Sequence, residues 1–289
     1  MNMRDHFNTE NNQNTPKDQG STRLKTVIVL LALAAGLIGM SLFGWHRLAP
    51  EPKKAENPQN LHKAGDDLYR VARYAEALPL YEQSLSLYRE MGDKQGEGTI
   101  LNNISRIYGV RDEYDMALKY LQQSLKIAQK IDDKTKESRD LNNIGLLYEK
   151  KGDYAQALQY YKQSLTITQE IGDKQGEGTT LNNIGQIYKV RGEYDIALQY
   201  YKQSLRITRN IGDKRTEGAT LNNIGQIYGA QSEYDKGLQY YEQSLIITRD
   251  IDDRRTEGAT LNNIGQIYGA RSEYDMALKY LQQSLKITQ

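Results

Sequence analysis

Apolar side chains recur at spacings of three and four residues from about residue 61 to the end of the chain. In one stretch Leu141, Ile144, Gly145 and Tyr148 fall at i, i+3, i+4 and i+7, which places them on one stripe of a helix. A second stripe starts after the polar turn KKGD and predicts another helix, which runs to about Ile171. Its members are Tyr154, Ala157, Leu158, Tyr161, Ser164, Leu165 and Thr168.

Short polar turns separate these helices at a fixed interval. GDK, DDK or DDR recurs at residues 92, 132, 172, 212 and 252. Gly172 suits the left-handed position after a helix, and the side chain of Asp173 suits the cap of the next helix. Each 40-residue unit therefore contains two helices and two tight turns.

Neither helix of a unit can bury its apolar stripe alone, so successive pairs must stack. The pattern predicts an all-α fold, a right-handed α-solenoid of about six helix-turn-helix repeats over residues 61–289, preceded by one N-terminal transmembrane helix. The predicted repeats lie near 61–93, 94–133, 134–173, 174–213, 214–253 and 254–289.

The unit resembles the tetratricopeptide repeat (TPR), and its 40-residue length is similar to the repeats of kinesin light chains and Pins-like scaffolds. The resemblance implies this fold, with the first helix of each pair lining a concave groove, but it does not specify a function. Its large, small and aromatic positions are occupied here by Leu141, Ile144, Gly145, Tyr148, Ala157, Tyr161 and Ser164.

Two adjacent amides also repeat every 40 residues, within LNNIG or LNNIS. On a helical wheel Asn142 lies about 100° and Asn143 about 200° from Leu141, so both amides leave the core stripe. The family resemblance implies that the inner amide of each motif binds the backbone of a peptide, whereas hydrogen bonding between neighbouring repeats is the alternative. The candidates are the inner Asn103, Asn143, Asn183, Asn223 and Asn263, the outer Asn102, Asn142, Asn182, Asn222 and Asn262, and Gln186, Gln226 and Gln266.

Three different segments precede the repeats. Residues 1–25 are polar and predict a disordered tail. Residues 27–45 contain no charged side chain and are long enough to span a bilayer as a helix, so we predict a transmembrane helix at 26–46. A cleaved signal peptide is the alternative. Residues 47–60 are rich in proline and charge and predict a linker.

Composition narrows the chemistry. The 38 basic and 37 acidic residues give a net charge of +1, which does not favour nucleic acid. There is no cysteine, and no histidine recurs in the repeats, so we expect no metal, no cofactor and no catalysis.

We therefore expect a single-pass membrane protein, with its N-terminus weakly favoured in the cytoplasm, that binds a partner peptide or helix in its groove. One alternative is a structural solenoid that self-associates through the span and through its sixth repeat, where an apolar flank should be exposed. Another is a truncated regulatory part of a larger signalling protein.

Overall fold

The computed structural model describes residues 57–288. The predicted tail and membrane helix, and most of the predicted linker, lie outside the described residues. Within 57–288 no helix is both long and apolar enough to cross a membrane. The first helix begins at Pro58, inside the predicted linker, because Asn57 caps it: the Asn57 side chain accepts a hydrogen bond from the backbone N–H of Gln59.

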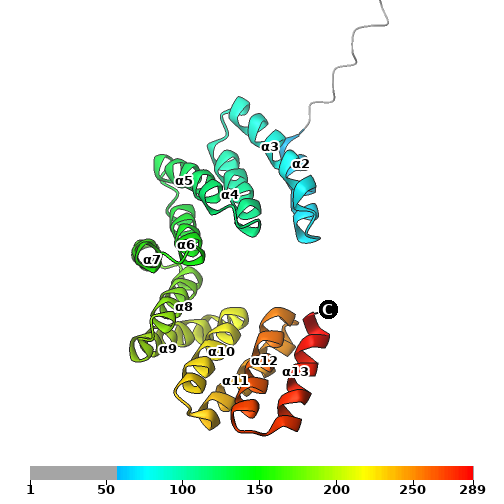
Figure 1. The fold of residues 1–289 in the computed structure, drawn as a ribbon. Coiled ribbons are helices and arrows are strands. Elements are labelled where there is room, and N and C mark those ends of the chain that lie inside the picture. The colour runs from blue at the N-terminus through cyan, green and yellow to red at the C-terminus, as the bar shows by residue number, and fades with distance from the viewer. Residues whose placement is uncertain (1–56, 289) are drawn as a thin grey trace, which may run out of the picture. The chain divides into compact units, whose positions relative to one another are not determined.

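Twelve α-helices and no strands make up the described part of the chain (Figure 1). This confirms the predicted all-α class, while the handedness of the solenoid stays a prediction. The helices are α2 (Pro58–Arg70), α3 (Tyr74–Met91), α4 (Lys94–Val110), α5 (Tyr114–Lys130), α6 (Lys134–Lys150), α7 (Tyr154–Glu170), α8 (Lys174–Val190), α9 (Tyr194–Ile211), α10 (Lys214–Ala230), α11 (Tyr234–Asp250), α12 (Arg254–Ala270) and α13 (Tyr274–Thr288).

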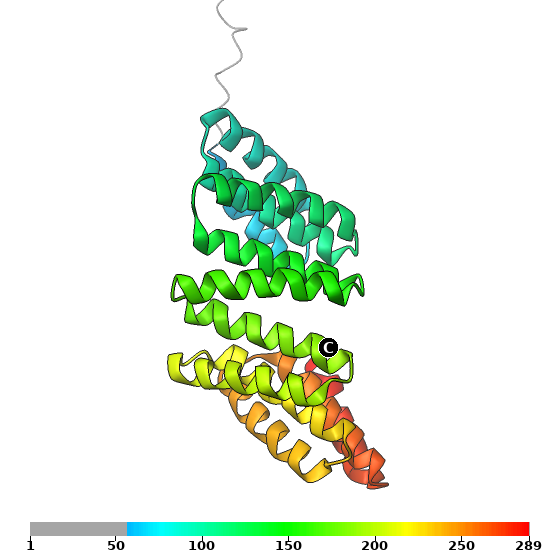
Figure 2. The ribbon, with the colours of Figure 1, turned by 90° about the vertical axis from the view of Figure 1, so that its left-hand side faces the viewer.

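The helices form six hairpins, and the second helix of each hairpin packs on the first helix of the next. Figure 2 shows the hairpins from the side, each lying against its neighbour. We call the first helix of each hairpin the A helix and the second the B helix. The A helices are α2, α4, α6, α8, α10 and α12.

The predicted turns are confirmed. Gly172 has a φ of +72°, and the backbone N–H of Gly176 donates to Asp173 Oδ1 at 2.9 Å. Where the turn reads DDK, Asp132 takes the same left-handed conformation with a φ of +56°. The polar turn therefore ends one helix and caps the next within two residues.

Each hairpin closes around a small residue on the A helix and a large one on the B helix. A Cβ atom at Gly185 would lie 2.6 Å from Cε1 of Tyr201, which is fully buried, so only glycine fits beside this ring. In the second hairpin Ser105 and Leu121 replace this pair. The same glycine–tyrosine contact joins Gly65 to Tyr81, Gly145 to Tyr161 and Gly225 to Tyr241.

A serine on each B helix, buried in every hairpin except the last, joins the two helices of the hairpin. Ser204 Oγ donates to the backbone oxygen of Gly178 at 2.8 Å, which satisfies the hydroxyl without water. The equivalent donors in the other hairpins are Ser84, Ser124, Ser164, Ser244 and Ser284.

The last helix leaves part of its apolar stripe uncovered, as expected. Leu278 is 56% and Leu285 58% exposed on α13, whereas the equivalent Leu245 of α11 is buried under α12. Leu281, which occupies the place of the buried Tyr241, is 39% exposed.

Candidate functional site

The candidate amides lie on the A helices, on the side where these helices approach one another. α6, α8, α10 and α12 pack directly on their neighbouring A helices, whereas no two B helices of residues 57–288 pack to that extent (Figure 1). We call this surface the A-helix face. It is formed by the LNN amides and the residues up to two turns after them on α4, α6, α8, α10 and α12.

The amides form a hydrogen-bonded ladder between repeats. Asn183 donates from Nδ2 to Oδ1 of Asn142 at 3.1 Å, and Thr180 Oγ1 donates to the same oxygen at 3.3 Å. The next two A-helix contacts repeat this arrangement. There, Asn223 and Thr220 donate to Asn182, and Asn263 and Thr260 donate to Asn222.

The ladder corresponds to the structural alternative stated above, but it does not use all of each amide. An asparagine side chain offers two N–H donors and one carbonyl acceptor. Asn183 uses one donor toward Asn142, and it is half-buried rather than buried. Its second N–H and its oxygen remain for another partner, and the same holds for Asn223 and Asn263. Peptide binding by these groups stays a prediction.

The ladder changes direction between α4 and α6. Asp140, which is fully buried, stands where later repeats have Thr180, and its carboxylate accepts from Asn102 Nδ2 at 2.8 Å and from Ser124 Oγ at 2.6 Å. Burial raises the pKa of Asp140, and Lys136 Nζ, at 3.6 Å, opposes that rise. Asn102 is therefore a donor here, whereas Asn142 is an acceptor.

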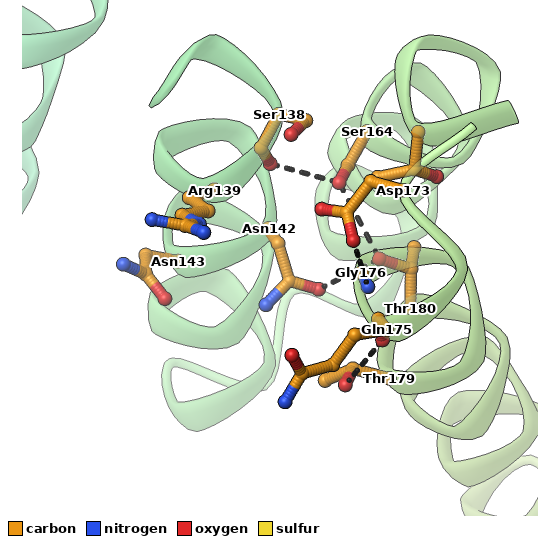
Figure 3. A pocket seen from close by; sticks show the side chains of 11 residues that line it. Ser138, Arg139, Asn142, Asn143, Ser164, Asp173, Gln175, Gly176, Thr179 and Thr180 are labelled. Atoms are coloured by element: carbon orange, nitrogen blue, oxygen red, sulfur yellow. Dashed lines mark hydrogen bonds between the residues drawn. The ribbon is translucent and has the colours of Figure 1, made fainter. Parts of the chain in front are cut away.

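Asn143 is left out of the ladder. Its side chain makes no hydrogen bond within the described part of the chain, although it is the counterpart of Asn183. Figure 3 shows Asn142 turned toward Thr180, while Asn143 and Arg139 point to the other side of α6.

Asn103 is the most enclosed of the inner amides. It is 9% exposed, and its Nδ2 lies 2.9 Å from Nε2 of His62 and 3.2 Å from Oδ1 of Asp66. The hydroxyl of Tyr81 donates to the same Asp66 oxygen at 2.6 Å. The structure thus places Asn103 in a polar cluster with the first hairpin, where little of it remains to meet a ligand.

The three candidate glutamines have different surroundings. Gln186 Oε1 accepts from the hydroxyl of Tyr201 at 3.3 Å, and Gln226 Oε1 accepts from Lys189 Nζ. Gln266 is exposed, and it makes no side-chain hydrogen bond with any residue of 57–288. Two of the three candidate glutamines are therefore hydrogen-bonded within the fold.

Sequence analysis did not select a pair of charged residues that lies beside these glutamines. Glu149 Oε2 accepts from the hydroxyl of Tyr161 at 2.8 Å, and burial raises the pKa of Glu149. Burial lowers the pKa of Lys189 to about 8, while Glu149 acts in the opposite direction. The aligned repeats contain a signal for this pair. Glu149 and Lys189 occupy the position that Gly229 and Gly269 hold in later repeats, so a charge at this position is specific to α6 and α8.

Open cavities follow the A-helix face. One of about 370 Å³ lies between α6 and α8 (Figure 3), and two of about 310 Å³ and 510 Å³ lie between α4 and α6. Asn143 lines all three. Among residues 57–288 no three His, Cys, Asp or Glu side chains gather in a way that would hold a metal ion.

The hairpins bury their apolar stripes against each other and carry a polar face along the A helices. This arrangement defines an α-helical repeat protein. Within that class the chain belongs to the tetratricopeptide repeat family, whose model matches residues 58–130, 137–210 and 216–289. No protein of curated function matches the sequence.

Solved structures share the fold at low sequence identity. BtubC from P. vanneervenii is 19% identical with a TM-score of 0.63, over 74% of this chain and 91% of that one. The apo form of RapI is 16% identical with a TM-score of 0.63, over 80% and 97%. A Rap protein in complex with competence and sporulation factor is 13% identical with a TM-score of 0.61, over 79% and 74%.

Proposed function

We propose that this chain is a membrane-anchored scaffold that binds an extended peptide segment, or a helix, of a partner protein along its A-helix face. Residues 27–45 are the proposed anchor, with the N-terminus in the cytoplasm and the repeats on the other side of the membrane. No catalytic step is part of the proposal.

The observation that carries the proposal is the partial use of the inner amides. Asn183, Asn223 and Asn263 each keep one N–H and one carbonyl oxygen after the ladder has formed. These two groups match the C=O and N–H of an extended peptide, whatever its side chains. The complex of a similarly folded Rap protein with competence and sporulation factor supports the same use of the fold.

The test is selection of a displayed library of random 12-residue peptides on the full-length chain in detergent. We expect enrichment on the wild-type chain that is reduced in the triple variant Asn143→Ala, Asn183→Ala, Asn223→Ala. The matched control changes two exposed amides of the B helices, Gln163→Ala and Gln203→Ala, and should leave enrichment unchanged. Absence of any enriched peptide on the wild-type chain would contradict the proposal.

The exposed leucines of α13 support a second candidate function, self-association through the last hairpin. Leu278 and Leu285 present an apolar surface at a position where every earlier hairpin is covered by the next A helix. Light scattering of the full-length chain in detergent should then show oligomers that dissociate in the variant Leu278→Gln, Leu285→Gln. A monomer at all concentrations would rule this function out.

The proposed orientation has its own test. Protease added outside intact cells should digest the repeats and spare a tag on residue 1. Digestion of the tag with protection of the repeats would show the reversed orientation. Protection of both would show that the repeats lie inside the cell, and it too would contradict the proposed orientation.

A further inference from the structure

The contact between α4 and α6 contains the one inner amide that the described fold leaves unbonded. By analogy with Asn183 and Asn142, the partner of Asn143 would be Asn102. The NH2 group of Asn102 is instead held by Asp140 Oδ1 at 2.8 Å. Asn143 thus makes no hydrogen bond to a neighbouring repeat, and it lines both cavities at this contact.

The cavity of about 310 Å³ beside Asn143 combines aliphatic and cationic side chains. Val110 and Leu146 are 44% and 40% exposed and line this cavity together, so the cavity offers an open aliphatic surface. Arg106 and Lys150 line the same cavity, and no Asp or Glu does. Its surface therefore suits an aliphatic group with a negative charge close by.

These cations form no ion pair within residues 57–288. The guanidinium of Arg106 lies 4.3 Å from the ring centre of Tyr69, and neither Arg106 nor Lys150 forms an ion pair within the described residues. Glu149, next to Lys150, accepts a hydrogen bond from Tyr161. Burial raises the pKa of Glu149, and Lys150 acts on it only through the longer-range attraction that opposes this rise. Arg139, one turn before Asn143, also forms no ion pair in residues 57–288, but it lines the cavity of about 510 Å³, which Asp133 and Asp140 line as well. An unpaired positive cluster of this kind attracts a carboxylate.

The same positions are neutral and small at the other end of the array. The cavity of about 500 Å³ between α10 and α12 is lined by Gln226, Ala230, Gln266 and Ala270, and by no charged residue. On α8 the equivalent Val190 is 47% exposed beside Lys189, but Lys189 donates to Gln226, whereas Arg106 and Lys150 make no side-chain hydrogen bond within residues 57–288.

We infer that the partner segment is an acidic, aliphatic peptide that is anchored at the α4/α6 contact. Asn143 binds the backbone of one peptide residue, whose aliphatic side chain packs on Val110 and Leu146. A neighbouring Asp or Glu of the peptide pairs with Arg106 or Lys150. This inference rests on the proposed function and specifies the chemistry of its partner.

The selection with random 12-residue peptides on the full-length chain tests the inference when three single variants are compared. Peptides enriched on the wild-type chain should carry Leu, Ile or Val within three residues of Asp or Glu. Synthetic copies should bind Asn143→Ala at least tenfold more weakly and the B-helix control Gln163→Ala with nearly unchanged affinity. Asp140→Thr, which installs the residue of the later repeats, should weaken binding several-fold, because Asn102 can then accept from Asn143.

The variant Arg106→Gln, Lys150→Gln provides an independent readout. It should still enrich aliphatic peptides but should no longer select acidic ones. Enriched peptides that bind Asn143→Ala as well as wild type, or that lack an acidic residue, would overturn the inference while the proposed function stands. A failure to enrich any peptide on the wild-type chain would remove both. Circular dichroism confirms that each variant is folded.

Discussion

The second hairpin (α4 and α5) and the fourth hairpin (α8 and α9) are equivalent units of the array, but they differ in one core contact and in one polar contact on the A-helix face. In the core, Ser105 and Leu121 replace the contact between Gly185 and Tyr201. On the A-helix face, the next hairpin supplies Asp140 in one case and a threonine in the other. A repeat can therefore keep its backbone while a few substitutions change which polar groups remain free for a ligand.

The largest effect should come from moving the core of the second hairpin into the fourth. Gly185→Ser places a Cβ 2.6 Å from the ring of Tyr201, so we expect a loss of about 2–3 kcal/mol in stability. Adding Tyr201→Leu recreates the pair found in the second hairpin and should recover at least half of that loss. Thermal unfolding followed by circular dichroism measures both, and simple additivity of the two losses would show that the residues are not coupled.

A smaller effect is expected from removing the threonine of the ladder. Thr220→Val deletes the hydrogen bonds from Thr220 Oγ1 to Asn182 Oδ1 at 3.1 Å and to the backbone oxygen of Thr216 at 2.7 Å, at a cost of about 1–2 kcal/mol. Thr179→Val is the matched control, because Thr179 bonds only to the backbone of its own helix. Equal shifts of the unfolding midpoint in the two variants would mean that the ladder adds nothing.

Two buried carboxylates should respond to pH with opposite sign. Lys214 and Arg209 donate to Glu217 at 2.9 Å each and lower its pKa, although burial acts against them. A lowered pKa in the folded state gives stability that is present above the usual carboxyl range and lost as the pH falls through the folded pKa. Glu217→Gln should therefore lower stability by about 1 kcal/mol at pH 7 and by much less at pH 3.

At Asp140 burial raises the pKa, so protonation favours the folded state and its contribution grows as the pH falls. The stability of Asp140→Thr relative to wild type should accordingly be highest at neutral pH and should decline toward acid. Parallel pH profiles for the Glu217 and Asp140 variants would contradict the assigned surroundings.

The smallest expected effect is the titration of the Lys189 side chain, which should leave the fold unchanged. Because burial lowers the pKa of Lys189 to about 8, the NMR signal of its ε-methylene carbon should move with a midpoint near pH 8. Lys189→Arg should remove that signal change. The second hairpin has Gly109 at this position and offers no counterpart. A Lys189 midpoint above pH 10 would show that its ammonium group is well hydrated.

The sequence predicts the helices, the turns and the core stripe because these depend on local spacing. The role of Gly145 follows from its place beside the aromatic position, and the cap at Asp173 from its place after a glycine. Whether each amide donates or accepts a hydrogen bond depends on contacts between repeats, such as that of Asn102 with Asp140. A helical wheel does not show these contacts. Asp140 differs visibly from Thr180 in the aligned repeats, but only the contact shows that this difference releases Asn143.

Side-chain amide hydrogen exchange measured by NMR tests most directly whether the ladder is interrupted at the α4/α6 contact. The NH2 signals of the inner asparagines can be assigned with single Asn→Ser variants of the full-length chain. The structure predicts that both N–H groups of Asn143 exchange fast, whereas one N–H each of Asn183, Asn223 and Asn263 is protected by the ladder. Protection of Asn143 equal to that of the other three would contradict the account.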